Sequence, residues 1–374
     1  MTKDLRWTNS SLLFAGLLVC LLFPHRAKAQ QFSSWSAPVN LNAIVLSDGT
    51  ACPPVVNTSF NDNHPTISKD GLSLIFESNR SGPVNLWFTE RDSLDDCWKK
   101  PVNLGSVVNS NPQATPFNNF APNITTDGHW LYFHSNRPTW LTADGIVVPS
   151  CGGGDVYVSH RQDKRNDRGW ETPVNLGCTI NAPGFDQAGP LHFEDEATGI
   201  QFLYFTQKPV GASAVFFDIY VSTCNADLAT CNTQGLWGPG TAVDALNSPF
   251  RDTRTAIRRR DGLEMILSTG RPGSLGSEDL WVSTRATTLD QNWLPPVPVN
   301  CEWTILMPPP CPSWAPADPP GTLAKDFVNS PAFDGAPALS WDGTELYFFS
   351  ERTDLPGFAG GRDLYISKRT KLPE

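Results

Sequence analysis

The sequence lacks the motifs that mark several common classes of protein. It contains no Cys-x-x-Cys pair, no Gly-x-Ser-x-Gly, no His-Glu-x-x-His and no glycine-rich phosphate loop that leads into a helix. These absences argue against zinc fingers, α/β-hydrolases, zinc proteases and P-loop enzymes. No segment repeats its apolar residues with a helical period. The longest apolar run, Leu12 to Phe23, is too short to span a bilayer.

Positive charge is also scarce. Lysine and arginine total 28 against 38 aspartate and glutamate residues, which gives a net charge of -10 at pH 7. An acidic chain repels nucleic acid and anionic membrane surfaces. Neither is therefore an expected partner.

The first residues have the pattern of an export signal. Lys3 and Arg6 precede the apolar run, and Ala27 and Ala29 end the segment with small residues. This order predicts a signal peptide over residues 1–29 and a periplasmic or extracellular protein with no membrane span.

The remainder is rich in residues that favour turns and strands. The chain has 33 Pro, 29 Gly and 13 Trp, which favours many short strands joined by turns. Eight cysteines follow residue 29, an even number that suggests disulfides in an exported protein. We expect Cys224 to pair with Cys231 and Cys301 with Cys311, and a zinc site is the alternative.

One phrase recurs five times along the chain. It reads "FNDNHPTISKDGLSLIFESNR" from Phe60, and related phrases start at Phe117, Phe185, Phe250 and Phe333. A second phrase follows each copy, as in "NLWFTE" and "DLYISK", and then comes a third of the type "PVNL". Alternating apolar residues and Asp-Gly pairs predict four strands, a to d, in each unit.

Five such units predict an all-β fold, a five-bladed β-propeller of four-stranded antiparallel blades. The domain should cover residues 30–374. Its blades are expected at about 57–105, 109–177, 181–243, 247–300 and 329–370. The last unit lacks strand d, which would leave an open sheet edge. We expect "SSWSAPVNLN" at 33–42 to supply that strand and close the ring.

The repeat resembles a known family. The phrases "P-x-(I/L)-(S/T)-x-D-G-x-x-L-Y-F-x-S-x-R", "G-G-x-D-(I/L)-Y-(V/I)-S" and "W-x-x-P-V-N-L-G" are similar to TolB-type, WD-like propeller repeats of exported bacterial proteins. The resemblance covers nearly all of the chain after residue 29. It implies a propeller fold and, in many such proteins, the binding of a partner. We expect a monomer.

Residue types that occur in every unit are expected to build the scaffold. Strand b ends on a basic residue each time, and strand c begins with Asn or Asp. The interpretation we favour is a repeated salt bridge or hydrogen bond across each b/c hairpin, and a ring of ligand-binding arginines is the alternative. The basic residues are Arg80, Arg137, Lys208, Arg271 and Arg352.

Positions that differ between units are better candidates for a site. Strand a lines the channel of a propeller, so residues near its start should form a polar ring at one channel mouth. These candidates are Asp62, His64, Asn119, Gln187, Asp252, Arg254 and Asp334. The alternative is that the ring only solvates the entrance and caps strand a. A structural Ca²⁺ bound by the aspartates is a further alternative, and no other cofactor is expected.

Three loop tryptophans are candidates for a recognition surface. Trp140, Trp303 and Trp314 lie in the longest loops, and exposed aromatic rings stack on sugars or peptide side chains. The alternative is that these proline-rich loops bury their own tryptophans.

The sequence alone favours a non-catalytic, exported module that binds a polysaccharide or a protein partner. The alternative is a glycoside hydrolase of the five-bladed propeller type that uses Asp62, Asp252 and Asp334. Such enzymes use an acid and a base carboxylate. No glutamate stands in the predicted ring to act as the acid, which is why binding is the preferred interpretation.

Overall fold

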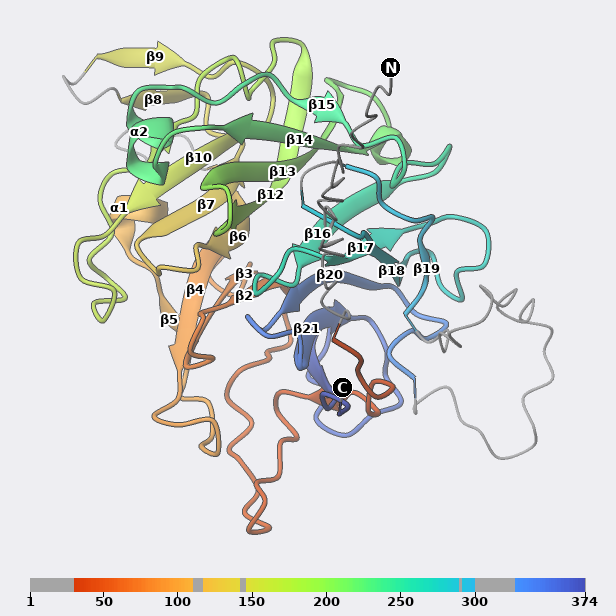
Figure 1. Ribbon diagram of the computed structural model, residues 1–374. Helices are drawn as coiled ribbons and strands as arrows, with labels where there is room; N and C mark the ends of the chain where they lie inside the picture. Colours follow the sequence, from red (N-terminus) through yellow and green to blue (C-terminus); the bar gives the residue numbers. More distant parts are fainter. Residues whose placement is uncertain (1–29, 110–116, 142–145, 289–290, 300–326, 374) are drawn as a thin grey trace, which may run out of the picture.

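The structure is a computed structural model that describes residues 30–109, 117–141, 146–288, 291–299 and 327–373. Five four-stranded antiparallel sheets are arranged around a central axis and form a five-bladed β-propeller (Figure 1). The predicted all-β fold is confirmed. Within the described residues, helix is limited to α1 (Ser106–Asn109), α2 (Leu228–Thr233) and the 3-10 turn η1 (Ala214–Phe216). No helix of these segments is long and apolar enough to cross a membrane.

The strands of each blade follow one another outward from the axis. Blade 1 comprises β2 (Asp62–Ile67), β3 (Ser73–Ser78), β4 (Asn85–Glu90) and β5 (Val102–Asn103). Blade 2 comprises β6 (Asn119–Ile124), β7 (Trp130–Ser135), β10 (Asp155–His160) and β11 (Val174–Asn175). Blade 3 comprises β12 (Phe185–Asp195), β13 (Ile200–Pro209), β14 (Asp218–Cys224) and β15 (Thr241–Ala242).

Blade 4 comprises β16 (Asp252–Ile257), β17 (Glu264–Thr269), β18 (Asp279–Thr284) and β19 (Val297–Pro298). Blade 5 comprises β20 (Asp334–Leu339), β21 (Glu345–Ser350), β22 (Asp363–Lys368) and, from the other end of the chain, β1 (Val39–Asn40). An additional hairpin, β8 (Thr139–Leu141) with β9 (Val147–Pro149), lies in the loop of blade 2.

The Asp-Gly pairs form the turns between the first two strands. Gly71 has a φ of +74°, which costs little for glycine but is unfavourable for other residues. The Asp70 carboxylate accepts a hydrogen bond from the Leu72 N–H at 3.1 Å and fixes the turn. The Asp-Gly pair thus forms the hairpin turn in each blade that contains it.

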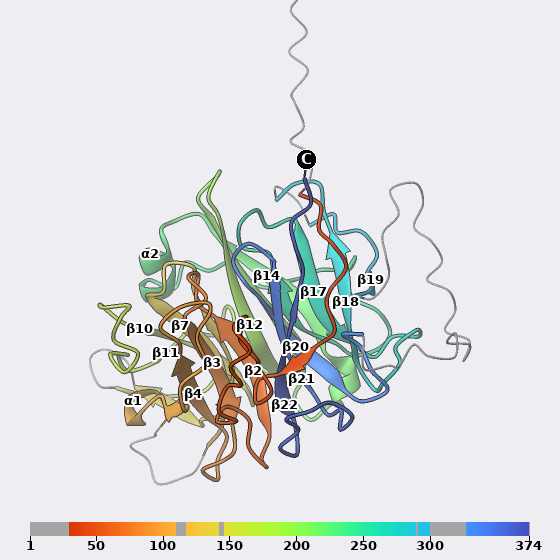
Figure 2. The same ribbon diagram turned by 90° about the horizontal axis from the view of Figure 1, so that it is seen from below.

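The two ends of the described chain are hydrogen-bonded together, as predicted. Val39 pairs with Ile366 and Asn40 with Tyr365 in antiparallel register, and Figure 2 shows the first and last segments running side by side. The Leu41 N–H also donates to the Leu364 carbonyl at 3.0 Å. The N-terminal strand therefore completes blade 5 and covers the edge of β22.

Five apolar clusters fill the five gaps between neighbouring blades. The cluster between blades 5 and 1 contains Leu41 from the closing strand, Phe76 from β3 and Tyr347 from β21. All three side chains are at most 1 % exposed, and each such burial is worth about 1.5 to 3 kcal/mol. The ring is therefore packed continuously, including across its closure.

Three disulfides tie loops to the blades: Cys52–Cys97, Cys151–Cys178 and Cys224–Cys231. The predicted pairing of Cys224 with Cys231 is confirmed. Cys301 and Cys311 lie outside the described residues, as does the predicted signal peptide at 1–29. Disulfides of this kind are typical of exported proteins.

Candidate active site at the channel mouth

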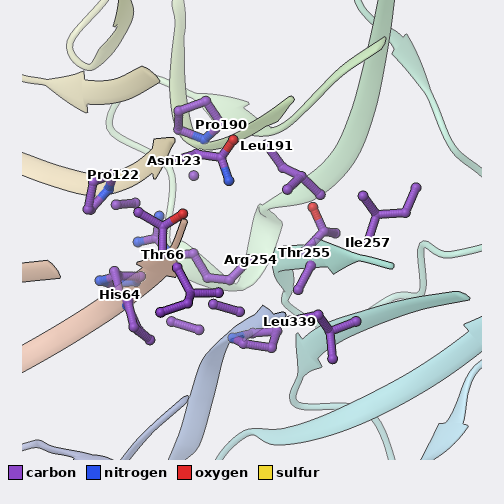
Figure 3. A pocket seen from close by; sticks show the side chains of 18 of the residues that line it. His64, Thr66, Pro122, Asn123, Pro190, Leu191, Arg254, Thr255, Ile257 and Leu339 are labelled. Atoms are coloured by element: carbon purple, nitrogen blue, oxygen red, sulfur yellow. The ribbon is translucent and has the colours of Figure 1, made fainter. Parts of the chain in front are cut away.

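The first strands of the five blades contact their neighbours in a ring and enclose a narrow channel (Figure 3). Its cavity volume is about 40 Å³, which accommodates water but is far below the roughly 300 Å³ at which ligand pockets begin. The channel interior is therefore too small for an organic ligand, which could bind only at its mouth.

A β-bulge interrupts the first strand of every blade at this mouth. The bulge residue has a φ between 46° and 56° in all five blades; these residues are His64, Ala121, Gly189, Arg254 and Ala336. That conformation costs a residue other than glycine on the order of 1 to 3 kcal/mol. Alanine or glycine suffices in three blades, whereas blades 1 and 4 carry a full His and Arg side chain.

The predicted carboxylates occupy a different environment from the one expected. Asp62, Asp252 and Asp334 are each 0 % exposed. In Asp252, Oδ1 lies 2.6 Å from Arg271 Nη2, and Oδ2 accepts from the Ser248 N–H and hydroxyl at 2.6 and 2.7 Å. Asp62 and Asp334 repeat this arrangement. Neither oxygen is available to a substrate.

The arginines at the end of strand b therefore have another partner than predicted. Arg137 donates to Asn119 Oδ1 at 2.7 Å and to the Val108 carbonyl at 3.1 Å, not to the start of strand c. The first residue of strand c instead caps its own loop: Asp155 accepts from the N–H groups of Cys151 and Gly152. The expected hairpin bridge is thus replaced by a bond between the first and second strands.

Gln187 belongs to the same buried layer. It is 1 % exposed, and its side-chain amide lies 3.1 Å from that of Gln207 on the neighbouring strand. Of the predicted ring, only His64 and Arg254 line the channel (Figure 3).

A glutamate that sequence reasoning missed stands beside His64. Glu77 Oε1 lies 2.7 Å from His64 Nδ1, and Glu77 Oε2 accepts from the Ala121 N–H at 2.6 Å. Burial raises the pKa of Glu77, but the contact with His64 and the charge of Arg254 outweigh it and bring the value to about 2. Burial lowers the pKa of His64 to about 4, and the charge of Arg254 adds to this. Near neutral pH the pair is a carboxylate beside a neutral imidazole.

Part of the role of Glu77 is structural. The residue at its position in strand b accepts a hydrogen bond from the next blade's bulge N–H in two further blades: His134 Nδ1 from Gly189, and Ser268 Oγ from Ala336. A serine is sufficient for that bond. Glu77 uses only Oε2 for it, and its Oε1 contacts His64 and accepts from the Asn63 side-chain amide at 3.3 Å.

A second glutamate, Glu278, precedes the third strand of blade 4. Its Oε1 lies 2.7 Å from Arg251 Nη1, and the Thr253 hydroxyl donates to its Oε2 at 3.4 Å. Burial raises the pKa of Glu278, and the charges of Arg251 and Arg254 oppose the rise without cancelling it. Both Glu77 and Glu278 stabilise the charged form of Arg254. The two carboxyl groups therefore belong to one electrostatic cluster with opposite pKa shifts.

The sequence contained a signal for both glutamates. At the position of Glu77 the other blades have His134, Thr206, Ser268 and Phe349. At the position of Glu278 they have Val84, Gly154, Phe217 and Arg362. Positions that differ between blades therefore occur at the end of the second strand and before the third strand as well as in the first strand.

The predicted tryptophan wall is largely untested. Trp303 and Trp314 lie outside the described residues, and the backbone of Trp140 pairs with Val148 in the additional hairpin. Exposed aromatic rings near the mouth instead include Phe60 and Phe250, 48 % and 42 % exposed, each two residues before a first strand. Both are suited to stack on a bound sugar.

Each of the three aspartates is bound to an arginine and to a serine or threonine of its own blade, and the structural Ca²⁺ stays a prediction. Within the residues that the structure describes, no group of three or more His, Cys, Asp or Glu side chains is arranged to hold a metal ion.

Solved structures share this architecture. An α-L-arabinofuranosidase of Podospora anserina, solved in complex with cellotriose, covers 91 % of this chain and 97 % of its own at 12 % identity and a TM-score of 0.50. An α-L-arabinofuranosidase from Lactobacillus brevis covers 87 % and 92 % at the same identity and TM-score. The likeness is one of fold. No protein-family model matches the chain, and no curated protein matches it.

These neighbours correct the predicted non-catalytic function. That prediction rested on the lack of a glutamate in the ring, whereas the two solved structures named above, which share the fold, are α-L-arabinofuranosidases. Two glutamates also lie close to the channel: Glu77 contacts the channel-lining His64, and Glu278 accepts from Thr253, which precedes the channel-lining Arg254. The propeller fold implied by the TolB-type resemblance is confirmed, with the five blades that the repeat predicted.

Proposed function

We propose that the protein is a glycoside hydrolase whose acid and base are Glu278 and Glu77 at the channel mouth. The observation that carries the proposal is the pair of carboxyl groups that both act on Arg254 and have opposite pKa shifts. Two titratable groups whose surroundings separate their pKa values are the recurring arrangement of acid and base in such enzymes.

The roles follow from the protonation states. The pKa of Glu77 is lowered by His64 and Arg254, so Glu77 is ionised near neutral pH and can activate water or attack the anomeric carbon. Burial favours the protonated form of Glu278, which can donate its proton to the leaving oxygen. The neutral His64 fixes the orientation of Glu77 without adding a competing charge. Asp62, Asp252 and Asp334 belong to the scaffold in this account.

The substrate is proposed to be a polysaccharide side chain or chain end. The narrow channel excludes a sugar, so the glycosidic bond must lie across the mouth, where Phe60 and Phe250 offer stacking surfaces. Both solved neighbours named above are arabinofuranosidases. An arabinofuranosyl linkage is therefore the first to be tested.

The test is hydrolysis by the purified protein, with release of reducing sugar measured on arabinoxylan, glucuronoxylan and homogalacturonan. We expect turnover on at least one, and we expect Glu77→Gln and Glu278→Gln each to lower kcat/KM by about 10² to 10⁴-fold. Glutamine keeps the shape of both side chains and lets position 77 still accept from the Ala121 N–H.

Glu264→Gln is the matched control. Glu264 is also a buried, ion-paired glutamate, but it bonds Arg258 and Arg369 at the opposite end of its strand pair. It should lose stability and keep kcat/KM. Equal losses of kcat/KM in all three variants, or none in the two mouth variants, would reject the assignment.

The three disulfides support export of the protein to the periplasm or the cell exterior. Kinship with TolB-type repeats rests on the repeated phrases and remains a prediction, as does the monomeric state.

A further inference from the structure

Two donor atoms of the Arg254 guanidinium have no hydrogen-bond partner among the described residues. Its Nε and Nη1 atoms are buried, and among the described residues no atom accepts a hydrogen bond from either. The arginines at the end of strand b, by contrast, have partners. Arg271 in the same blade donates to Asp252 and to the Leu246 carbonyl, both at 2.6 Å. An unsatisfied buried donor costs about 1 to 3 kcal/mol, and more when it is charged. The site retains Arg254 against this cost.

The backbone of blade 3 also leaves room for the Arg254 side chain. Its side chain crosses the bulge of blade 3, where a Cβ on Gly189 would lie 3.0 Å from Nη1 and 3.1 Å from Cδ. Blades 2 and 5 carry alanine at the same bulge with φ values of 47° and 50°. The backbone therefore tolerates alanine, and the glycine at 189 is explained by the guanidinium that passes over it.

Arg254 differs from the neighbouring arginines in its pairing. Arg251 Nη1 lies 2.7 Å from Glu278 Oε1, and Arg362 Nε donates to Glu351 Oε1 at 2.8 Å. Burial keeps His64 and His134 neutral near pH 7, so neither adds charge. Among the described residues, no carboxylate accepts from Nε or Nη1 of Arg254, and these two donors can receive an anion.

We propose that the saccharide bound at the channel mouth carries a carboxylate, as a uronic acid residue does, and that Arg254 binds this group. The planar guanidinium can form two parallel hydrogen bonds with a carboxylate, which a lysine cannot do. A neutral sugar offers hydroxyl groups only and leaves the charge uncompensated. The inference rests on the proposed function, because it names the substrate class of the same site.

The test is titration calorimetry with D-galacturonate and D-glucuronate, compared with D-galactose and D-glucose as their neutral counterparts and with acetate as a bare carboxylate. We expect at least ten-fold tighter binding of one uronate than of its neutral counterpart and of acetate. Arg254→Met should abolish that preference, and Arg254→Lys should recover only part of it. Thermal unfolding of each variant verifies that it is folded.

Gly189→Ala provides a second variant that leaves every charge in place. The added methyl group should displace the guanidinium and weaken uronate binding several-fold, whereas Ala336→Gly, the control at the equivalent bulge of blade 5, should not. Equal affinity for uronate and neutral sugar, equal affinity for acetate, or a preference that survives Arg254→Met would overturn the proposal.

The outcomes separate the two proposals. Hydrolysis that depends on Glu77 and Glu278 without any uronate preference would retain the hydrolase and reject the anionic substrate. Uronate binding that depends on Arg254 without hydrolysis of any tested polysaccharide would do the reverse.

Discussion

Two layers of side chains lie two residues apart in the first strand of each blade. In the outer layer Asp62, Asp252 and Asp334 are bound to an arginine and a hydroxyl residue of their own blade, with both oxygens occupied. In the inner layer His64 and Arg254 face the channel in a strained conformation. The residues of the outer layer recur in several blades, and their polar groups are hydrogen-bonded within the blade. The residues of the inner layer differ between blades, and Nε and Nη1 of Arg254 have no acceptor among the described residues.

The difference indicates where a repeat protein can place chemistry. Positions that hold each blade together must be filled in every copy, so they are unavailable for catalysis even when they are acidic. Positions where a small residue is structurally sufficient can vary. Ser268 and Glu77 illustrate this, since both accept a bond from the next blade but only Glu77 also places a carboxylate oxygen against His64.

The largest expected effect is on ring closure. Deletion of residues 33–42 removes β1 and the buried Leu41, and it opens an edge on β22. We expect no cooperative thermal unfolding transition. Leu41→Ala should cost about 2 to 5 kcal/mol, while Val39→Ala, at a side chain 39 % exposed, should change the free energy of unfolding little. A deletion protein with a wild-type transition would refute the closure.

A smaller but still large effect is expected in the outer layer. Arg352→Met leaves the fully buried Asp334 without its ion partner, which should lower the free energy of unfolding by about 3 to 5 kcal/mol. Lys99→Met, in an exposed ion pair with Glu90 and Asp92, should leave the unfolding midpoint nearly unchanged. Equal midpoints for the two variants would contradict the scaffold role.

The inner layer should respond to pH. The pKa of His64 is lowered to about 4 in the folded state, so the unfolded chain binds a proton first and stability falls as pH decreases from about 6.5 to 4. Arg254, Glu77 and Arg362 are the charged groups that act on this ring. Urea unfolding at pH 6.5 and 4.5 should show a smaller difference in His64→Gln than in the wild type. An identical difference would show that His64 does not titrate as described.

The smallest effect is expected at a hydrogen bond between neighbouring blades. Ser268→Ala removes the acceptor of the Ala336 N–H, a bond of 2.9 Å, and should cost about 1 kcal/mol with kcat/KM unchanged. The measurement is urea unfolding together with the hydrolysis assay. A loss of activity would mean that this position matters beyond packing.

The sequence was sufficient to predict the fold because the repeat is explicit. Asp70-Gly71 and its copies mark the hairpins, and the early "PVNL" at 38–41 has no blade of its own except the last. Local strand and turn chemistry therefore determined both the blade count and the closure.

The site was predictable only in part. His64 and Arg254 were found because they vary at one position of the first strand. The partner of each scaffold arginine could not be found, because Asp and Asn occur at the starts of both strand a and strand c and sequence spacing does not choose between them. Glu77 and Glu278 lie on other strands, and only the ring of blades brings them to the same mouth.

The most direct test of this comparison is a pair of variants from blade 1, Asp62→Asn and Glu77→Gln. The unfolding midpoint and kcat/KM of both proteins are measured on the polysaccharide that the wild type hydrolyses. The account predicts that Asp62→Asn lowers the midpoint and keeps kcat/KM in the folded protein, and that Glu77→Gln loses at least about 100-fold in kcat/KM with little change in midpoint. The reverse pattern, with activity lost at Asp62 and retained at Glu77, would contradict it.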